Sequence, residues 1–324
     1  MSRLIYLPQF PAKMRYQSWF INDFITQMSP YFDEIITLGD LYLLLNKNIS
    51  HEKELFSPIN KSIEFELSQI KHYMSLDIDE NNDILLHMDL SFPGLFHNVL
   101  YHKRPKKCFC YCHATSLNIM DLFEKDRTSK WLTELGNLLI YDKVFIGTNY
   151  HKYKLMGECE EEDWSNLSEK IEVVGLPIPP FETFKEDKIY DIISVARPCP
   201  QKVDAELEKC IEDKFGPIVR KECNTWEEYY KFLSQGKILL ISANEETFGY
   251  PVMEAIMNNT VVLAPDRCSY PELLSSQFIY RSELDLIAKL SLILKNYDRG
   301  EFPKLKCFDL CSNFYENIAQ IMKA

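Results

Sequence analysis

The feature that most constrains the fold is the alternation, along the whole chain, of short apolar runs with amphipathic stretches. The apolar runs have the length and composition of buried strands, and the stretches between them place apolar side chains on one face of a helix. Repeated strand–helix units of this kind predict an α/β protein in which helices cover both faces of a parallel sheet. The 324 residues are enough for two such domains.

The predicted elements fall into two sets, separated by a proline-rich stretch at 175–181 that stops regular structure. The first set has expected strands at 4–7, 34–38, 84–87, 107–111 and 143–146, and expected helices at 18–28 and about 117–139. The second set has expected strands at 190–195, 218–220, 237–242, 260–263 and 278–279. Its expected helices are 203–213, 225–233, 251–257, 282–296 and about 307–322.

These sets predict a Rossmann-like N-terminal domain at 1–178 and a Rossmann-like C-terminal domain at 179–306. A C-terminal helix at 307–324 is expected to pack back toward the N-terminal domain. The predicted fold class is α/β, with two parallel sheets that face each other across a cleft. Open α/β sheets bind ligands at the carboxyl ends of their strands, so the loops that follow strands are the expected place of functional residues.

Composition excludes some classes of protein. Hydrophobic residues make up 46% and charged residues 26%, as in globular proteins, and no long apolar run predicts a membrane span. The N-terminus is typical of a first strand rather than a signal peptide. The ten cysteines are scattered, as in a reduced intracellular protein. We therefore expect a cytoplasmic location (that of the host, if a phage encodes the protein) and no membrane insertion.

The net charge of −12 argues against indiscriminate binding to nucleic acid, because such binding depends on a basic surface. One local basic patch, HKRPKK at 102–107, leaves two interpretations open. It is either a solvated loop before a strand or a contact to nucleic acid.

Two groups of residues resemble metal ligands in type but not in spacing. Cys108, Cys110 and Cys112 alternate as on a strand, and they lack the Cys-x-x-Cys turn that suits tetrahedral zinc, even with His113 beside them. The stretch Asp77–Asp79 lies among acidic and Asn residues and is expected to be a solvated turn. Its continuation lacks the glycine and the final glutamate of a calcium loop. We expect no metal site.

Two cations and two carboxylates follow predicted strands of the C-terminal half. Arg197 and Lys202 come just after the strand at 190–195. Such a pair suits a diphosphate, because arginine offers a fork of donors and lysine a mobile point charge. Glu246 lies in the loop after the next long strand, and Glu254 lies eight residues further on, inside the helix that follows.

This combination resembles the nucleotide-sugar site of retaining glycosyltransferases with two Rossmann-like domains, the GT-B fold, and above all their large family four. The family pattern is Arg-x4-Lys-Gly, then Glu-x-Phe-Gly-x4-Glu-Ala, a helix, Gly-x-Pro-Val-Val-Ala and a later Glu. The matching residues are Arg197, Lys202, Glu246, Phe248, Gly249, Glu254, Ala255, Val262, Ala264 and Glu272. The resemblance covers the second predicted domain well and the first loosely.

The resemblance implies roles for these residues. Arg197 and Lys202 would hold the donor diphosphate and stabilise the leaving group, and Glu254 would bind the ribose hydroxyls. The sugar and phosphate would be contacted by Glu246 and by the donor-binding residues Thr247, Phe248, Gly249 and Tyr250. From the residues alone, the carboxylates could instead stabilise the start of a helix.

His113 closes a predicted strand in the stretch 112–118, and the resemblance implies that it faces the donor sugar. In isolation, a histidine after a strand is more often a structural hydrogen-bonding group, so both interpretations stay open. Thr148 is expected to cap the helix after the strand at 143–146, with Lys152 and Lys154 on the surface.

The implied activity is a retaining, metal-independent transfer of a sugar from a nucleoside-diphosphate sugar to an acceptor hydroxyl, with no cofactor. The stretch 265–274 with 278–280 resembles a subset that modifies nucleic-acid bases, including queuosine tRNA glycosyltransferases and phage enzymes that glycosylate hydroxymethylated DNA bases. We therefore expect an acceptor on a modified base of DNA or tRNA. A glycan, lipid or small-molecule acceptor stays open, as does a non-catalytic nucleotide-sugar-binding protein.

The chain departs from the family pattern in the loop at 8–17. The family has a glycine-rich loop there, and this chain has PQFPAKMRYQ, in which Lys13, Arg15 and Gln17 are candidate substitutes. Smaller departures replace two glycines and a proline of the pattern, at Val203, Asn259 and Val261. No departure removes a charged residue of the predicted site.

Overall fold

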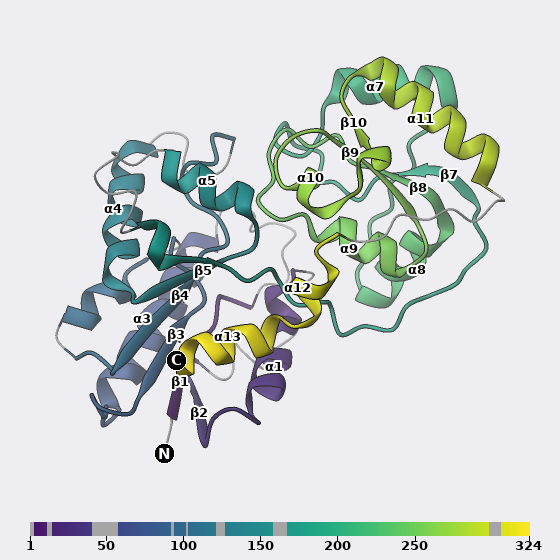
Figure 1. The fold of residues 1–324 in the computed structure, drawn as a ribbon. Coiled ribbons are helices and arrows are strands. Elements are labelled where there is room, and N and C mark those ends of the chain that lie inside the picture. Colours follow the sequence, from purple (N-terminus) through teal and green to yellow (C-terminus); the bar gives the residue numbers. More distant parts are fainter. Residues whose placement is uncertain are drawn as a thin grey trace. The chain divides into compact units, whose positions relative to one another are not determined.

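The structure is a computed structural model, and it describes residues 3–11, 15–40, 58–91, 94–101, 103–120, 127–157, 167–297 and 306–324. Contacts divide the chain into two compact units, whose elements are labelled in Figure 1. The first unit comprises Met1–Gly147, Lys152–Pro180 and Asn313–Ala324, and the second comprises Thr148–His151 and Phe181–Ser312. The division into domains at 178 and 306 stays a prediction.

Six parallel strands form the sheet of the first unit, in the order β2-β1-β3-β4-β5-β6. Their bounds are β1 Arg3–Leu7, β2 Glu34–Thr37, β3 Ile84–His87, β4 Lys107–Tyr111, β5 Lys143–Ile146 and β6 Ile171–Val173. All five strands predicted in this half are present. The central strands are buried almost throughout, as expected where helices cover both faces of a parallel sheet.

The helices of the first unit depart further from the prediction. They are α1 Gln17–Met28, α3 Pro58–Ser75, η1 Phe96–Tyr101, α4 Arg127–Ile140, the later part of α5 Asn149–Gly157, and α13 Phe314–Lys323. The helix predicted at 117–139 is wrong at its start, because 116–120 contain turns and α4 begins at Arg127. Residues 121–126 lie outside the described part of the chain. Helix α3 was not predicted.

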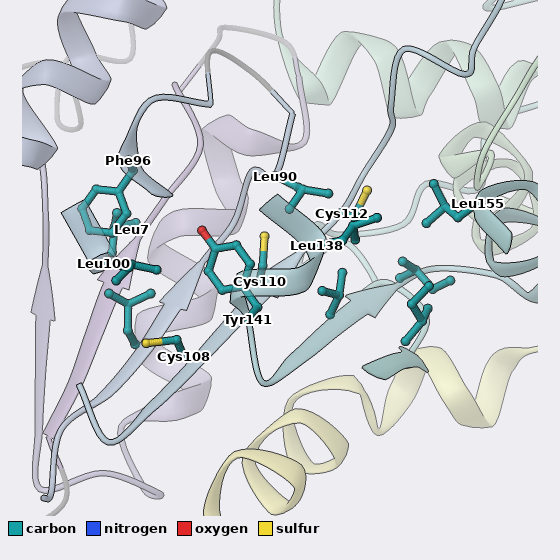
Figure 2. Packing of buried hydrophobic residues seen from close by; sticks show 14 of the residues in the cluster. Leu7, Leu90, Phe96, Leu100, Cys108, Cys110, Cys112, Leu138, Tyr141 and Leu155 are labelled. Atoms are coloured by element: carbon teal, nitrogen blue, oxygen red, sulfur yellow. The ribbon is translucent and has the colours of Figure 1, made fainter. Parts of the chain in front are cut away.

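Alternate residues along β4 and its C-terminal end build the core of the first unit. Cys108, Cys110 and Cys112 join one buried cluster with Leu138 and Tyr141 (Figure 2). Burial raises the pKa of the Cys108 thiol to about 12. The thiol is therefore protonated at neutral pH and packs as a small apolar group, which confirms the strand interpretation of this segment.

Four parallel strands form the sheet of the second unit, in the order β10-β9-β8-β7. Their bounds are β7 Tyr190–Ile193, β8 Gly236–Leu240, β9 Val261–Pro265 and β10 Ile279–Tyr280. The strand predicted at 218–220 is reduced to one parallel bridge, between Val219 and Ile193. This bridge lies on the side of β7 opposite to β8.

The helices of the second unit are α7 Ala205–Phe215, α8 Trp226–Gln235, α9 Tyr250–Met257, α10 Tyr270–Leu273, η3 Ser276–Phe278, α11 Glu283–Asn296 and α12 Phe308–Ser312. Side-chain caps fix several of their starts. Asp204 accepts from the Leu207 amide and Thr225 from the Glu228 amide, at 3.1 and 3.2 Å. Among the described residues, none of the helices combines the length and apolarity that crossing a bilayer requires.

Helix α13 belongs to the first unit, where it packs on α1. The ring of Phe314, which is 0% exposed, lies 6.0 Å from that of Phe20. The hydroxyl of Tyr315 donates to Asp23. The single helix predicted at 307–322 is thus two helices, with Asn313 between them.

Candidate functional site

The carboxyl ends of β7 and β8 are the place in the second sheet where a ligand is expected. The chain continues from β7 through α7 to the bridge at Val219, and from β8 through α9 to β9 on the other side. Connections that leave neighbouring strands in opposite directions create the switch point at which open α/β sheets bind ligands. The loops at 194–204 and 241–249 start there, and they contain the predicted cations and one predicted carboxylate.

Lys202 and Glu246 meet directly. The ammonium donates to Oε2 of Glu246 and to the carbonyl of Glu245, both at 3.0 Å, and each side chain of the ion pair is 19% exposed. The other oxygen of Glu246 accepts from the Thr247 amide at 3.0 Å. An ammonium has three N–H groups. Two of these are used here, so one remains for an anion.

Arg197 lies five residues before Lys202 in the same loop, and it is half-buried. Its guanidinium makes no hydrogen bond or ion pair with any residue that the structure describes. Partly buried guanidinium groups usually pair with an anion. The loop after β7 therefore carries one cation paired within the protein and one that can take an external anion.

The turn at 247–249 requires its glycine. Gly249 has φ +99°, and a Cβ there would lie 3.2 Å from Cε1 of Tyr270. The turn is held by Ser269, whose hydroxyl donates to the Phe248 carbonyl at 2.6 Å, and by Thr148, which donates to the Thr247 carbonyl at 2.9 Å. Helix α9 begins directly after it, so the first amides of the helix point toward the switch point, as in many phosphate sites.

Helix α5 starts beside this turn, in the segment 148–151 that belongs to the second unit. Thr148 accepts from the His151 amide at 3.2 Å, which confirms the predicted cap. Glu272 accepts from the amides of Asn149 and Tyr150, at 2.9 and 2.5 Å. Glu272 thus has a structural role at the start of α5.

Glu254 lies inside α9 and is only 4% exposed. Its Oε2 accepts from the hydroxyl of Tyr229 at 2.8 Å, and its Oε1 from that of Tyr230 at 3.2 Å. Burial raises the pKa of Glu254 to about 7, although both hydrogen bonds act in the opposite direction. The predicted ribose contact of Glu254 stays a prediction. In the structure, both oxygens of its carboxyl group already accept hydrogen bonds from tyrosine hydroxyls.

His113 lies in the first unit, at the carboxyl end of β4. Its ring is 4.3 Å from that of Tyr111 and 5.1 Å from that of Tyr16, measured between centroids. Of the candidate substitutes in the loop at 8–17, Arg15 and Gln17 are half-buried, and Lys13 lies outside the described residues.

Two of the four basic residues that the structure describes in the patch at 102–107 are engaged within the protein. Lys103 donates to the Leu76 carbonyl, and Arg104 forms an ion pair with Asp142 at 3.0 Å. Lys106 is exposed, and His102 lies outside the described residues. The described part of the patch therefore keeps Lys106 and Lys107 for contacts outside the protein.

No group of three or more His, Cys, Asp or Glu side chains is arranged to hold a metal ion in the described part of the chain. The stretch at 77–79 leads into a turn, in which Asp79 accepts from the amide of Asn81 at 2.9 Å and from the side chain of Asn82 at 2.6 Å. The prediction of a turn there is confirmed.

Sequence reasoning missed Tyr229 and Tyr230 as partners of Glu254. It also missed Tyr150, whose hydroxyl interacts with Cys268 near Glu245 and Glu246. Spacing along the chain gives no signal for these contacts, because they join different helices and loops.

No protein-family model and no curated protein sequence matches the chain. Solved structures do match. The lipopolysaccharide outer core galactosyltransferase WaaB is 14% identical, with a TM-score of 0.61 over 99% of this chain and 100% of that one. Sucrose-phosphate synthase from Thermosynechococcus elongatus is 10% identical, with a TM-score of 0.60 over 100% of this chain and 94% of that one.

Other matches extend the range of proteins with this fold. The pneumococcal O-GlcNAc transferase GtfA, solved with UDP and GlcNAc, is 13% identical, with a TM-score of 0.51 over 80% of this chain. This chain spans only 59% of GtfA and 55% of TarM. A UDP-N-acetylglucosamine 2-epimerase is 12% identical, with a TM-score of 0.52 over 98% of this chain and 94% of that one. At these identities the likeness is one of fold, and with its two parallel sheets the chain has the fold of the GT-B glycosyltransferases.

Proposed function

We propose that the protein is a glycosyltransferase that moves a sugar from a nucleoside-diphosphate sugar to an acceptor hydroxyl, with retention of configuration and without a metal or other cofactor. The observation that carries the proposal is the pairing of Lys202 with Glu246 at the switch point of the second sheet. Arg197 lies in the same loop as Lys202, and its guanidinium has no partner among the residues that the structure describes. Glycosyltransferases among the structural matches, one of them solved with UDP and GlcNAc, support a donor of this class.

The cations would act on the leaving diphosphate. Arg197 offers a fork of donors and Lys202 its third N–H, and both would stabilise the negative charge that grows as the bond to the anomeric carbon breaks. The first amides of α9 would add to this field. In the resembling enzymes the acceptor attacks from the side of the leaving group, and a phosphate oxygen can take its proton, so no carboxylate is needed as a nucleophile.

The sugar would be held by Glu246 and the donor-binding residues Thr247, Phe248, Gly249 and Tyr250. Lys202 fixes Glu246 in one orientation at 3.0 Å. A carboxylate held in this way can accept hydrogen bonds from sugar hydroxyls without first having to be ordered.

For the acceptor we propose a hydroxyl on a modified base of DNA or tRNA, on the resemblance of the stretch at 265–274. Lys103 and Arg104 have partners within the protein, so they give no further support to a nucleic-acid acceptor. A glycan, lipid or small-molecule acceptor is the alternative within the same reaction. A protein that binds nucleotide sugars without catalysis, or that epimerises them, is the alternative of another class.

The experiment is a panel of nucleotide sugars with nucleic acid containing hydroxymethylated bases, or with simple glycosides, followed by mass spectrometry of all products. A transferase releases nucleoside diphosphate and adds a hexose or pentose mass to one acceptor, and NMR of that product gives the anomeric configuration. If the donor is bound but stays chemically unchanged, the protein is a nucleotide-sugar-binding protein and not a transferase. An altered sugar with no released nucleotide would identify an epimerase.

Arg197→Ala and Lys202→Ala are expected to lower the rate of transfer at least tenfold, which corresponds to about 1.4 kcal/mol or more of lost stabilisation. Arg281→Ala is the matched control, because the Arg281 side chain is 78% exposed in the same unit and forms an ion pair with Asp266. Wild-type rates in the first two variants would reject the phosphate assignment. EDTA should leave the rate unchanged, and a loss that magnesium restores would overturn the metal-free mechanism.

A further inference from the structure

Two cysteines lie against each other close to the point where the chain leaves the second unit, which ends at Ser312. Cys307 directly precedes the first residue of α12, and Cys311 lies inside that helix. Their Sγ atoms are 3.6 Å apart, so the two sulfur atoms are in contact and one thiol can donate a hydrogen bond to the other. Both cysteines are reduced in the structure.

The two thiols differ in exposure. Cys311 is 1% exposed, whereas Cys307 is half-buried. The hydrogen bond to Cys311, and after it burial, raises the pKa of the Cys307 thiol. At neutral pH the pair is therefore a protonated dithiol, and a reagent in solution reaches it at Cys307.

The backbone at Cys307 permits the two sulfur atoms to come closer. A disulfide needs Cβ atoms about 3.5–4.5 Å apart, whereas residues four apart on a helix have Cβ atoms about 5–6 Å apart, so the pair has to close by roughly 1–2 Å. Cys307 lies in a turn ahead of α12, and its carbonyl accepts from the Cys311 amide at 3.0 Å. Because a residue in a turn can rotate without unwinding the helix that follows, Cys307 is the residue that moves.

Contacts with α10 limit the direction of this movement. The amide of Lys306 donates to the Leu273 carbonyl at 2.8 Å, and the Lys306 ammonium donates to the Pro271 carbonyl at 2.8 Å. The residue before Cys307 is thus fastened at two points. The turn cannot swing Cys307 away from Cys311 unless both of these hydrogen bonds break.

Other half-buried thiols of the second unit have oxygen atoms as neighbours. The thiol of Cys210 lies 2.8 Å from Oε1 of Glu283, and that of Cys223 lies 3.7 Å from the carbonyl oxygen of Lys221. Neither of these contacts offers a second sulfur, so both cysteines serve as controls for the pair in α12.

We propose that Cys307 and Cys311 form a reversible disulfide, with a small-molecule disulfide such as oxidised glutathione as the oxidant. The Cys307 thiolate attacks one sulfur of the oxidant, forms a mixed disulfide and releases one glutathione thiol. The Cys311 thiolate then attacks Sγ of Cys307, and the second glutathione leaves as a thiol. The two protein thiols are oxidised, the oxidant is reduced to two thiols, and the two protons of the cysteines pass to these.

The bridge closes a very short loop, so it restricts the unfolded chain less than a bridge between distant residues would. A bond of this kind suits a modification that is made and removed, which is the usual role of a disulfide in a reducing compartment. The inference is independent of the proposed sugar transfer.

The test exposes the full chain to oxidised glutathione and maps all its disulfides by tandem mass spectrometry without reduction. In the wild type, the bond between Cys307 and Cys311 should be at least about tenfold more abundant than a glutathione adduct at Cys307, because the second thiol attacks within the same molecule. Dithiothreitol should restore both thiols. Cys210 and Cys223, which have no sulfur beside them, should keep any glutathione that they take up.

Two variants separate the steps. Cys311→Ala should convert the bond into a lasting glutathione adduct at Cys307, and Cys307→Ala should leave Cys311 unmodified, because the buried thiol is not reached from solution. Absence of the bond between Cys307 and Cys311 in the wild type would overturn the inference, whether Cys307 then carries glutathione or stays a thiol. This outcome requires no variant, so it decides the matter even if a variant does not fold.

Discussion

At the scale of single residues, two glutamates of one motif have opposite environments. Glu246 is partly exposed and paired with Lys202, whereas Glu254 is buried and bonded to neutral phenols. Because desolvation disfavours the charged form, burial raises the pKa of Glu254 from 4.5 to about 7. The sequence pattern locates both carboxyl groups, but it contains no information on this difference.

This pKa makes stability depend on pH. The folded protein keeps the proton of Glu254 to a higher pH than the unfolded chain, so its contribution to stability is lost as the pH rises from about 4.5 through about 7. Between pH 5 and pH 8, the free energy of unfolding of the wild type should fall by up to about 3 kcal/mol relative to Glu254→Gln, which cannot ionise. Urea unfolding of both proteins at the two pH values measures this. Equal pH dependence would contradict the burial of a titrating carboxyl group.

At the scale of elements, a helix or strand is predicted correctly when the side chains that face the core are apolar. Most of the strands were found because their residues are apolar on both faces. Helix α3 was not, because Glu66 and Gln69 occupy core-facing positions beside Phe65 and Tyr73. Gln69 donates to the Pro8 carbonyl at 2.8 Å, and Glu66 accepts from the Phe96 amide. These buried polar groups interrupt the apolar period, and their partners lie too far along the chain to be foreseen.

The start of α9 allows a test of the turn at 247–249. Gly249→Ala and Gly216→Ala both place a side chain at positive φ, +99° and +87°, and each should cost about 1–2 kcal/mol of stability. Only at Gly249 does the new Cβ also meet Tyr270, whereas nothing lies within 4 Å at Gly216. Gly249→Ala should therefore also weaken nucleoside-diphosphate binding, measured by calorimetry. Equal nucleoside-diphosphate affinities in the two variants would mean that this turn does not contribute to donor binding.

At the scale of the whole molecule, the sequence predicts two parallel sheets and the loops that carry functional residues, because both follow from local patterns. It also predicts that a C-terminal helix packs back toward the N-terminal domain, but it could not predict which residues that helix contacts. In α13, Phe314 is 0% exposed and lies 6.0 Å from Phe20 and 6.1 Å from Tyr111, between ring centroids. These partners come from α1 and β4, 294 and 203 residues earlier in the sequence.

The last residues are therefore expected to stabilise the fold of the first. Phe314→Ala should destabilise the first unit by about 3–5 kcal/mol, because it leaves a cavity among aromatic rings. Phe308→Ala, six residues earlier in α12, is the matched control, since that ring is 50% exposed and its loss should cost no more than about 0.5 kcal/mol. Hydrogen exchange should become faster in β1 and β4 for Phe314→Ala alone. Nucleoside-diphosphate affinity should stay unchanged, because Arg197 and Lys202 belong to the second unit. Unchanged protection of β1 and β4 would mean that α13 is an appendage rather than part of the core.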